Sequence, residues 1–539
     1  MPRLAPPVRR FRVSATAAAP QAHGGRPGDT PRRRTIAVAL SLGLFTFLGR
    51  LVPVLRGGGL TGRDSYDPFV YYSAAVSLWS GRLPYRDFLL LHPPGMLLPL
   101  LPFAGLGAVA GDPVGMAAAR VAIMLTGAGS TVLIYLILRP RGEAGAVIGA
   151  ALYAVWFPAF YTERDVRLEA VAGFLVLAGL LLVQRRRSPG ATLPTLLAGA
   201  LFGAAAMVKL WGVVGVLVLV VWLGWQYGPR RAILAAAGAA LAGVQLLLPF
   251  ATVLPQFVQF AVIDQLGRTR REDPPAGRLA DLLGVGPVPG AAPAVLAVAV
   301  VLAAIAVGIA LRTADGRLHG LLVLSGVAVL LAGPTWYPHY SALVAGPLCL
   351  VLGNAVTVVA GRLPRPGLRR LALGAPVLGI VVAYLLLLGQ SVGYRFPGPE
   401  LATALRGRPG CVTTDRPAAL VLSDTLRRNL ARGCPVVVDP LGYKFSAQRL
   451  ALSPRENRLR FNRLLTDYLG SGASAVLVKG APEDLGPDNA ERIESWPVVG
   501  SAGRLLIREP VPAAASPAWQ RVLDSIQPPR RGGADEAVG

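Results

Sequence analysis

The chain has 539 residues, of which 53% are hydrophobic and 15% charged, and its mean hydropathy is +0.51. It contains about ten apolar runs of roughly 14–22 residues, close to the length that crosses a bilayer, which excludes a water-soluble protein. The formal net charge of +25 suggests a nucleic-acid partner, but the arginines lie mostly in short loops between the apolar runs. That distribution is typical of cytoplasmic loops in a membrane protein, and we expect no nucleic-acid partner.

Residues 1–35 are rich in proline, alanine and arginine and are predicted to be a disordered cytoplasmic tail. The first apolar run, 36–55, follows three consecutive arginines at 32–34. This run is longer than the apolar part of a signal peptide, and no clear cleavage site follows it. We therefore expect a retained first span that runs from the cytoplasm outward.

Five arginine-rich turns indicate which side of the membrane each loop faces. These turns are 139–143, 185–187, 230–231, 312–317 and 362–370. If all five are cytoplasmic, the chain makes one net crossing between the first span and the first turn, although two apolar segments lie there. Segment 93–110 contains four prolines, so we expect it to lie along the outer interface or to re-enter, while 117–138 crosses.

The apolar runs that follow alternate across the membrane without conflict. They are 144–160, 168–183, 192–208, 212–225, 232–250, 292–311, 318–332, 341–360 and 371–390. The expected fold is a polytopic α-helical membrane protein with about eleven spans. Its transmembrane domain would occupy residues 36–390 in the plasma membrane, with the N-terminus cytoplasmic and the segment after residue 390 outside.

The first outer loop is unusually polar for a segment that lies beside hydrocarbon. Residues 63–95, RDSYDPFVYYSAAVSLWSGRLPYRDFLLLHPPG, contain three aspartates, three arginines and one histidine. Charges at the membrane edge are energetically expensive, so such a cluster is a candidate functional site. The candidate side chains are Asp64, Asp67, Arg86, Asp87 and His92.

Other polar residues fall on the same predicted face of the membrane. The segment YTERDVRLE supplies Glu163, Arg164, Asp165, Arg167 and Glu169, and later outer loops supply Lys209, Arg268, Arg270, His339 and Tyr340. Lys209 stands out because only three of the 54 basic residues are lysines. Carboxylates, cations and aromatic rings that converge on one face would suit an active site for a charged, lipid-linked substrate.

Three motifs of the first loop carry a resemblance to a known family. They are Asp67-Pro-Phe-Val-Tyr71, Pro84-Tyr85-Arg86-Asp87-Phe88 and His92-Pro93-Pro94. The loop resembles the first outer loop of GT-C-fold glycosyltransferases, above all the bacterial members related to protein O-mannosyltransferases and aminoarabinose transferases. That group also has a second acidic outer loop and a lysine in a small-residue hairpin. The resemblance covers roughly residues 36–345, and it departs from the family's usual Asp-Glu at Asp67-Pro68.

The resemblance implies an inverting transfer of a sugar from a polyprenyl-phosphate donor to a hydroxyl of a glycan, lipid or protein acceptor outside the membrane. Asp67 matches the family's acidic position and is the expected general base, and Asp165 is a second catalytic candidate. Lys209, Arg268 and Arg270 would hold the phosphate, whose developing charge needs fixed cations. The other candidates are expected to bind substrate: Asp64, Arg86, Asp87, His92, Arg164, Glu169, His339 and Tyr340.

Each of these assignments has a structural alternative. Asp67 before Pro68 is also a good start for a helix, and the other acids and arginines could pair locally. Lys209 could simply reach the interface from a helix end, where aromatic residues also serve as anchors. No His or Cys cluster has metal-ligand spacing, so we expect no cofactor and no obligatory metal, with a divalent ion left as an option.

Two other functions compete with transfer: a transporter or flippase of lipid-linked sugars, and a non-catalytic membrane scaffold. Transporters usually have internal repeats and a substrate site near the bilayer midplane. The sequence contains no evident repeat, and its polar groups gather at one face, which favours the transferase. Mannose and arabinose donors remain equally compatible with the sequence.

After residue 390 the chain changes character, and residues 391–510 are predicted to form a small extracytoplasmic α/β domain. The expected strands are 410–415, 434–440, 474–480 and 504–509, and the expected helices are 420–431 and 456–469. Cys411 and Cys434 open two of these strands, and outside the membrane a disulfide between them is expected, with two buried thiols as the alternative. Residues 511–539 are predicted to be a disordered tail.

Overall fold

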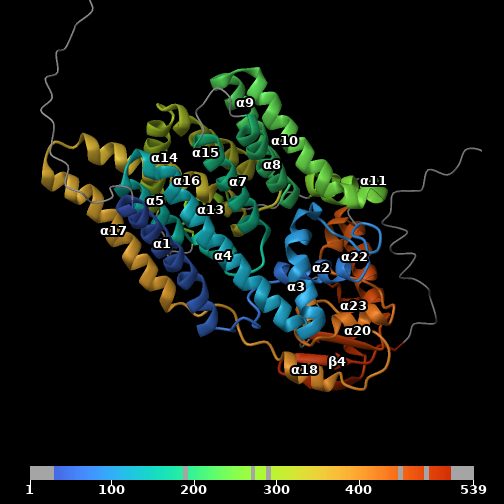
Figure 1. Ribbon diagram of the computed structural model, residues 1–539. Helices are drawn as coiled ribbons and strands as arrows, with labels where there is room; N and C mark the ends of the chain where they lie inside the picture. The colour runs from blue at the N-terminus through green and yellow to red at the C-terminus, as the bar shows by residue number, and fades with distance from the viewer. Residues whose placement is uncertain are drawn as a thin grey trace, which may run out of the picture.

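A bundle of long helices with a small domain at one end makes up the chain (Figure 1). The computed structural model describes residues 29–185, 192–268, 274–286, 293–446, 453–478 and 485–511. The expected fold class, a polytopic helical membrane protein with a small C-terminal α/β domain, is confirmed by this architecture.

The first helix, α1 (Asp29–Arg56), begins earlier than expected. Residues 29–35 are helical, so the prediction of a disordered tail up to residue 35 is wrong for its last seven residues. Pro31 lies in the first turn, where a missing backbone N–H costs no helical hydrogen bond, and arginine is a good helix former. The rest of the predicted tail, 1–28, lies outside the described residues.

The proline-rich segment that was expected not to cross forms a short helix at the end of the bundle that carries the C-terminal domain. The elements here are α2 (Asp67–Trp79), η1 (Pro94–Met96), α3 (Leu97–Ala110) and α4 (Asp112–Leu138). Gly111, with φ of 92°, makes the sharp turn between α3 and α4. Arg427 of the C-terminal domain donates a hydrogen bond to the Ala104 carbonyl and pairs with Asp112 at 2.9 Å. These contacts fix the domain to α3 and to the start of α4.

The central helices follow in chain order and pack closely through small residues. They are η2 (Arg139–Arg141), α5 (Glu143–Val155), α6 (Phe157–Glu163), α7 (Leu168–Arg185), α8 (Thr192–Val208), α9 (Gly212–Tyr227), α10 (Pro229–Leu247), η3 (Leu248–Val253), α11 (Leu254–Phe257), η4 (Val258–Ile263), α12 (Asp264–Leu266) and α13 (Pro275–Leu282). The bundle is completed by α14 (Pro293–Ala310), α15 (Ala314–Ala332), η5 (Pro338–Ser341), α16 (Ala342–Arg362) and α17 (Pro366–Gly389). Gly199 and Gly203 of α8 lie directly against the α10 backbone at Ala235 and Ala239, where any side chain would clash.

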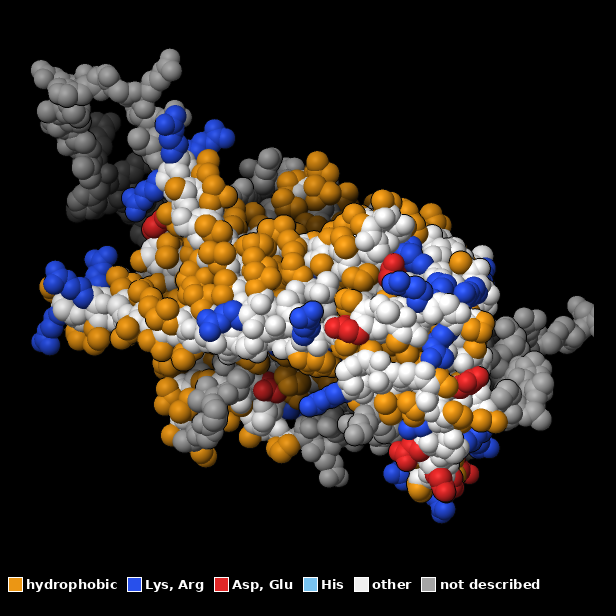
Figure 2. Space-filling view, turned by 90° about the horizontal axis from the view of Figure 1, so that it is seen from below, with side chains coloured by type: hydrophobic (Ala, Val, Ile, Leu, Met, Phe, Trp, Pro, Cys, Tyr) orange, Lys and Arg blue, Asp and Glu red, His pale blue; other side chains and the backbone are white. Residues whose placement is uncertain are grey.

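Seven helices in the described part of the chain are long and apolar enough to cross a membrane, or eight if α5 and α6, bent by 58°, form one span. Four apolar helices are shorter: 94–110, 168–184, 192–208 and 212–227. The expected count of about eleven spans is therefore not confirmed. On the face that Figure 2 shows, hydrophobic side chains cover most of the helical part, and only a few charged side chains interrupt them.

The C-terminal domain contains one four-stranded sheet with the order β1-β2-β4-β3. Its elements are α18 (Gly398–Ala404), β1 (Val412–Thr414), α19 (Pro417–Leu422), α20 (Leu426–Ala431), α21 (Tyr443–Ser446), α22 (Pro454–Gly470), β2 (Ser474–Val478), α23 (Pro487–Glu494), β3 (Val498–Ala502) and β4 (Leu505–Arg508). Strands β1 and β2 are parallel, whereas β2 pairs antiparallel with β4, and β4 antiparallel with β3. The predicted disordered tail lies outside the described residues from 512 onward.

Three of the four expected strands form, and the fourth, 434–440, is wrong. This segment contains Pro435 and Pro440, which lack an N–H to donate to a sheet, and it leaves the sheet toward the helical domain. The expected helix 420–431 is broken into α19 and α20 at Asp424, which has a positive φ of 55°. Strand β3 was not predicted, because its alternation of exposed and half-buried residues is weak.

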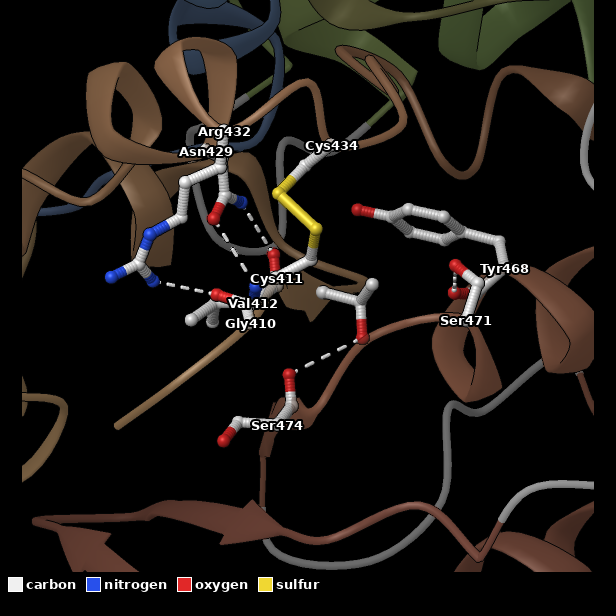
Figure 3. Close-up of a disulfide and its surroundings, with 10 residues drawn as sticks. Gly410, Cys411, Val412, Asn429, Arg432, Cys434, Tyr468, Ser471 and Ser474 are labelled. Atoms are coloured by element: carbon white, nitrogen blue, oxygen red, sulfur yellow. Dashed lines mark hydrogen bonds between the residues drawn. A yellow bond between two sulfur atoms is a disulfide. The ribbon is translucent and has the colours of Figure 1, made fainter. Parts of the chain in front are cut away.

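A disulfide joins Cys411 and Cys434, the two cysteines that the sequence singled out (Figure 3). Beside it, Asn429 of α20 accepts a hydrogen bond from the Val412 N–H and donates one to the Val412 carbonyl. The disulfide therefore fastens the start of segment 434–440 next to β1.

Replacement of both disulfide cysteines, Cys411→Ser with Cys434→Ser, should destabilise the C-terminal domain. The bond closes a loop with a sequence separation of 23 residues, and such a constraint on the unfolded chain is worth about 2–4 kcal/mol. Limited proteolysis of the detergent-purified protein should cleave this domain faster in the variant. Cys349→Ala, at the buried free cysteine of α16, is the control. Equal cleavage of wild type and double variant would contradict the expectation.

Candidate active site

The stretch from the last residue of α6 to the first turn of α7 carries five charged residues, each paired with a different part of the chain. The pairs are Glu163 with Arg50, Arg164 with Asp64, Asp165 with Arg120, Arg167 with Asp67, and Glu169 with Lys209. The partners come from α1, the loop before α2, α4, the start of α2 and the α8–α9 connection. We call residues 163–169 the charged segment.

The deepest pair joins α1 to α6. Arg50 and Glu163 are 2.9 Å apart, and neither side chain is meaningfully exposed. Tyr153 also donates a hydrogen bond to Glu163, and Arg50 donates another to the Ala154 carbonyl. Because both charges are paired and further hydrogen-bonded, they can lie among apolar helices at tolerable cost. This pair has a structural role.

The second buried ion pair joins α4 to the charged segment, and its hydrogen-bonding groups also have partners. Arg120 pairs with Asp165 at 2.8 Å and donates hydrogen bonds to the carbonyls of Leu60 and Gly62. Asp165 also accepts the Val166 N–H. Since both oxygens of Asp165 are bonded to Arg120, the geometry favours a positioning role for this residue over the predicted catalytic one.

Arg164 and Asp64, the next pair along the segment, line a small cavity together with the Arg120–Asp165 pair. Nη2 of Arg164 is 2.9 Å from Oδ2 of Asp64, and the guanidinium lies over the rings of Phe160 and Tyr161 at 4.9 and 4.8 Å. The cavity has a volume of about 10 Å³. It is too small for a sugar, so these predicted substrate ligands hold the loop before α2 in place.

Asp67 is the first residue of α2 and is held differently from the acids above. Tyr66 occupies the N-cap position. The Asp67 carboxylate, 38% exposed, faces Nη1 of Arg167 at 3.7 Å and Nε2 of His339 at 3.9 Å, both longer than hydrogen bonds. It is therefore surrounded by cations and a ring while its oxygens stay accessible, which a helix cap alone would not require.

The remaining members of this cluster come from α7, the α8–α9 connection and η5. Lys209 donates a hydrogen bond to Oε1 of Glu169 at 2.5 Å, and its ammonium lies 4.1 Å from the centre of the Tyr340 ring. His339 is 3.8 Å from the same Glu169 oxygen. Five of the predicted site residues, Asp67, Glu169, Lys209, His339 and Tyr340, are thus brought together.

Arg268 follows α12 and supplies a further cation. Its guanidinium stacks 4.0 Å from the Phe445 ring of the C-terminal domain. It is buried, its Nε has no partner, and it makes no hydrogen bond to another residue of the described ranges. Buried donors that lack a partner are costly, so this side chain is suited to bind an anion. Arg270, also predicted to bind phosphate, lies outside the described residues.

The C-terminal domain also contributes an acid that the sequence did not reveal. Tyr66 donates a hydrogen bond to Oδ1 of Asp439 at 2.9 Å and accepts one from the Leu441 N–H at 3.1 Å. Burial raises the pKa of the Asp439 carboxyl to about 6, with the charge of Asp67 adding to the rise. Segment 434–440, which the sequence predicted as a strand, is therefore a wall of the site.

Although 38% of the Asp67 side chain is exposed, the protein around it removes much of its water, and this desolvation is the largest influence on its pKa. It raises the pKa of the Asp67 carboxyl, while the nearby charge of Arg167 acts in the opposite direction. Burial lowers the pKa of His92 well below its usual value, and the positive charges of Lys209 and Arg268 reinforce this. His92 is thus neutral and lies edge-on to Tyr71, with 5.8 Å between ring centres.

Two predicted substrate ligands lie apart from this cluster. Arg86 and Asp87 pair with each other at 2.9 Å, and the Arg86 side chain is 53% exposed. Asp87 also accepts a hydrogen bond from the Leu83 N–H, which closes the local turn. Their contacts are those of a loop that stabilises itself.

Arg50 and Arg120, both missed in the sequence, lie inside apolar runs. A single arginine in a predicted span is itself a signal of a buried partner, and that signal could have found both. Asp439 and Tyr66 carried no comparable signal. Among the described residues no three His, Cys, Asp or Glu side chains come together as a metal ion would require, and metal independence stays a prediction.

Comparisons with known proteins agree with this architecture. The sequence model of glycosyltransferase family 87 matches residues 90–334. The structure of ArnT from Cupriavidus metallidurans bound to undecaprenyl phosphate is similar, with a TM-score of 0.58 and 17% identity over 91% of this chain and 100% of that one. This chain has the GT-C fold. No curated protein matches the sequence.

A second GT-C structure is more distant in sequence but covers much of the same fold. It is the oligosaccharyltransferase AglB from Archaeoglobus fulgidus, in complex with an inhibitory peptide and a dolichol-phosphate. Its TM-score is 0.53 and its identity 9%, over 84% of this chain and 70% of that one. The family match and the shared fold together support glycosyl transfer by a multi-pass membrane protein.

The Arg120→Leu substitution should unfold the protein at markedly lower temperature, because it leaves Asp165 charged and buried without a partner. Breaking such a pair costs about 3–5 kcal/mol. The double variant Arg120→Leu with Asp165→Leu should recover a large part of the loss, measured by thermal unfolding in detergent. Arg86→Ala, which breaks the exposed pair, is the control and should have little effect. If Arg120→Leu lowered the melting temperature no more than the control Arg86→Ala does, Asp165 would not depend on Arg120.

Proposed function

We propose that this protein transfers a sugar from a polyprenyl-phosphate donor to an acceptor hydroxyl, with inversion, and that Asp67 is the general base. One observation carries the proposal: the Asp67 carboxylate is 38% exposed, more than that of Asp64 or Glu169, and lies among cations whose donors are not all used. A carboxylate with a raised pKa is a better proton acceptor at neutral pH than an ordinary one.

In the proposed reaction Asp67 takes the proton of the acceptor hydroxyl as the hydroxyl oxygen attacks the anomeric carbon of the donor. The new carbon–oxygen bond forms on the face opposite the phosphate, and the bond from that carbon to the phosphate oxygen breaks. Polyprenyl phosphate leaves with the bonding electrons, so no strong general acid is needed. Asp67 then releases its proton to solvent.

Arg268 is the proposed main ligand of the phosphate. Its guanidinium is buried against Phe445, keeps donors without a partner and acts on the charge of Asp67. Lys209 contributes positive charge while it is held by Glu169, and an ammonium has two further donors. The similar ArnT and AglB structures contain undecaprenyl phosphate and dolichol-phosphate, which supports a donor of this chemical class.

The orientation in the membrane follows from the arginine-rich turns. Four of these turns, 139–143, 230–231, 312–317 and 362–370, lie at the ends of the helices opposite to the charged segment, and the positive-inside rule would place them in the cytoplasm. The Asp67 cluster and the C-terminal domain would then be extracytoplasmic. Lipid-linked sugar and acceptor would meet beneath segment 434–440, which contributes Asp439 to the wall of the site.

The Asp67→Asn variant should lose about 100- to 10,000-fold in transfer rate, because the amide cannot take the acceptor proton. The assay follows transfer from a radiolabelled polyprenyl-phosphate sugar by purified protein in detergent. Asp87→Asn, at the self-contained loop pair, is the matched control and should stay near wild type. Thermal unfolding must show both variants folded. Undiminished transfer by Asp67→Asn would remove Asp67 as the base, while no transfer by wild type with any donor would favour a transporter or scaffold.

The pH profile should report the ionisation of Asp67. Transfer needs the carboxylate, so the rate falls as the pH drops through a pKa that lies above the ordinary 3.8. Arg167→Gln removes a positive charge that lowers this pKa, so the acidic limb should move to higher pH.

The charged and titratable groups that act on Asp67 are Arg167, Glu169, Lys209, Arg268 and His339, together with Tyr71 and Asp439. Arg167→Lys keeps the positive charge and should leave the acidic limb near its wild-type position. A limb that moved to lower pH in Arg167→Gln, or not at all, would show that another group limits the rate.

A further inference from the structure

One carboxylate of the C-terminal domain lies beside the Asp67 cluster and takes no part in the proposed proton transfer. Oδ1 of Asp439 accepts hydrogen bonds from the Tyr66 hydroxyl at 2.9 Å and from the Gly442 N–H at 2.8 Å. Tyr66 directly precedes Asp67 at the start of α2. One oxygen of Asp439 is therefore held firmly, at the point where the C-terminal domain meets the site.

The second oxygen of Asp439 is open. Oδ2 makes no hydrogen bond to any residue in the described ranges, and it is not among the polar atoms there that burial closes off, since the residue is only half-buried. Gly442 leaves room for this oxygen, because a Cβ at that position would overlap with Oδ2. A carboxylate oxygen that is neither bonded nor closed off can accept a hydrogen bond from a ligand.

Asp439 lies near both groups on which the proposed reaction depends. The charge of Asp67 raises the pKa of Asp439, and the charge of Arg268 lowers it. Arg268 also stacks at 4.0 Å on Phe445, which belongs to α21 shortly after Asp439. In an inverting transfer the base and the phosphate lie on opposite faces of the sugar ring. A group that is close to both lies beside the ring.

We infer that Asp439 recognises the sugar of the lipid-linked donor, and that its Oδ2 accepts a hydrogen bond from a hydroxyl of that sugar. Asp439 acts within the proposed transfer reaction, on which this inference rests, and it selects the sugar rather than the lipid phosphate. A hydrogen bond from a hydroxyl to a carboxylate is stronger than one between neutral groups. A site that contains such a bond discriminates against a ligand without the hydroxyl, because the carboxylate is then left without its partner.

Lipid binding by the full-length protein in detergent, followed by native mass spectrometry, tests this role. The probes are undecaprenyl phosphate without a sugar and undecaprenyl phosphate that carries mannose, arabinose, glucose or galactose. Wild type should bind at least one sugar-carrying lipid more tightly than undecaprenyl phosphate itself. Asp439→Asn keeps an oxygen for Tyr66 and Gly442 but presents an amide N–H where Oδ2 was. It should weaken binding of that sugar-carrying lipid about tenfold and leave undecaprenyl phosphate unchanged.

Three further variants separate sugar recognition from a structural role. Gly442→Ala pushes the Asp439 carboxylate aside without removing its charge, and it should act like Asp439→Asn. Arg268→Gln should weaken every lipid alike, because Arg268 is the proposed ligand of the phosphate. Asp488→Asn, at an exposed acid of α23 in the same domain, is the matched control and should bind like wild type.

Equal losses for the bare and the sugar-carrying lipid in Asp439→Asn would overturn the inference, and so would no loss for either, which is the result if Asp439 contacts the acceptor instead. A wild type that binds no sugar-carrying lipid more tightly than undecaprenyl phosphate would also overturn it. If wild type bound none of these lipids, the proposed polyprenyl-phosphate donor would be contradicted as well. The other outcomes contradict the role of Asp439 alone, so the two failures are distinguishable.

Discussion

The structure depends on the need to neutralise five charges within seven residues at the edge of a membrane. Glu163, Arg164, Asp165, Arg167 and Glu169 are all buried, and an unpaired buried charge would cost several kcal/mol. Each of them obtains its partner from a different element, so α1, α2, α4, the loop before α2 and the α8–α9 connection must all meet at this segment. Helix packing among apolar faces tolerates many small shifts, but the four of these pairs that lie at hydrogen-bond distance do not. The charged segment therefore fixes the relative positions of the helices more strictly than hydrophobic contact does.

The acids of the charged segment and its partners differ in how fully their oxygens are bonded. Some of them only stabilise the fold, whereas Asp67 remains available for a reaction. Glu163 and Asp165 have their oxygens bonded to arginine or tyrosine, and nothing further can approach them. Toward Arg167 the pairing becomes looser: Asp67 has charged neighbours at 3.7 and 3.9 Å, and no residue in the described part of the chain makes a hydrogen bond to its carboxylate. An accessible carboxylate whose neighbours do not satisfy it is where a substrate can supply the missing contacts. Asp67 differs from the other acids in its lack of close hydrogen-bond partners among the described residues. This difference becomes visible only in the folded structure.

The sequence predicted the membrane class, the helical regions and most of the clustered residues, because charge beside hydrocarbon is conspicuous in any sequence. It could not predict the pairing. Arg50 and Glu163 are 113 positions apart, and Tyr66 and Asp439 are 373 apart, so no local pattern connects them. The strand expected at 434–440 failed for a related reason: its three valines fit a strand, but its course is set by the disulfide at Cys434 and by Tyr66 at the other end. Long-range contacts overrode a local preference there.

Segment 434–440 also changes how the C-terminal domain is understood. The domain is more than a cover over the bundle, because it provides Asp439 and Phe445 to the surroundings of Asp67 and Arg268. Pro68 stands where the resembling family commonly has a second acid, and in this chain the nearby acid comes from a distant part of the sequence. The domain is held in place by Arg427 on Asp112 and by Asp424 on the Asp112 N–H. The position of Asp439 therefore depends on how the domain docks on α3 and α4, and the site is shared between two domains of the chain.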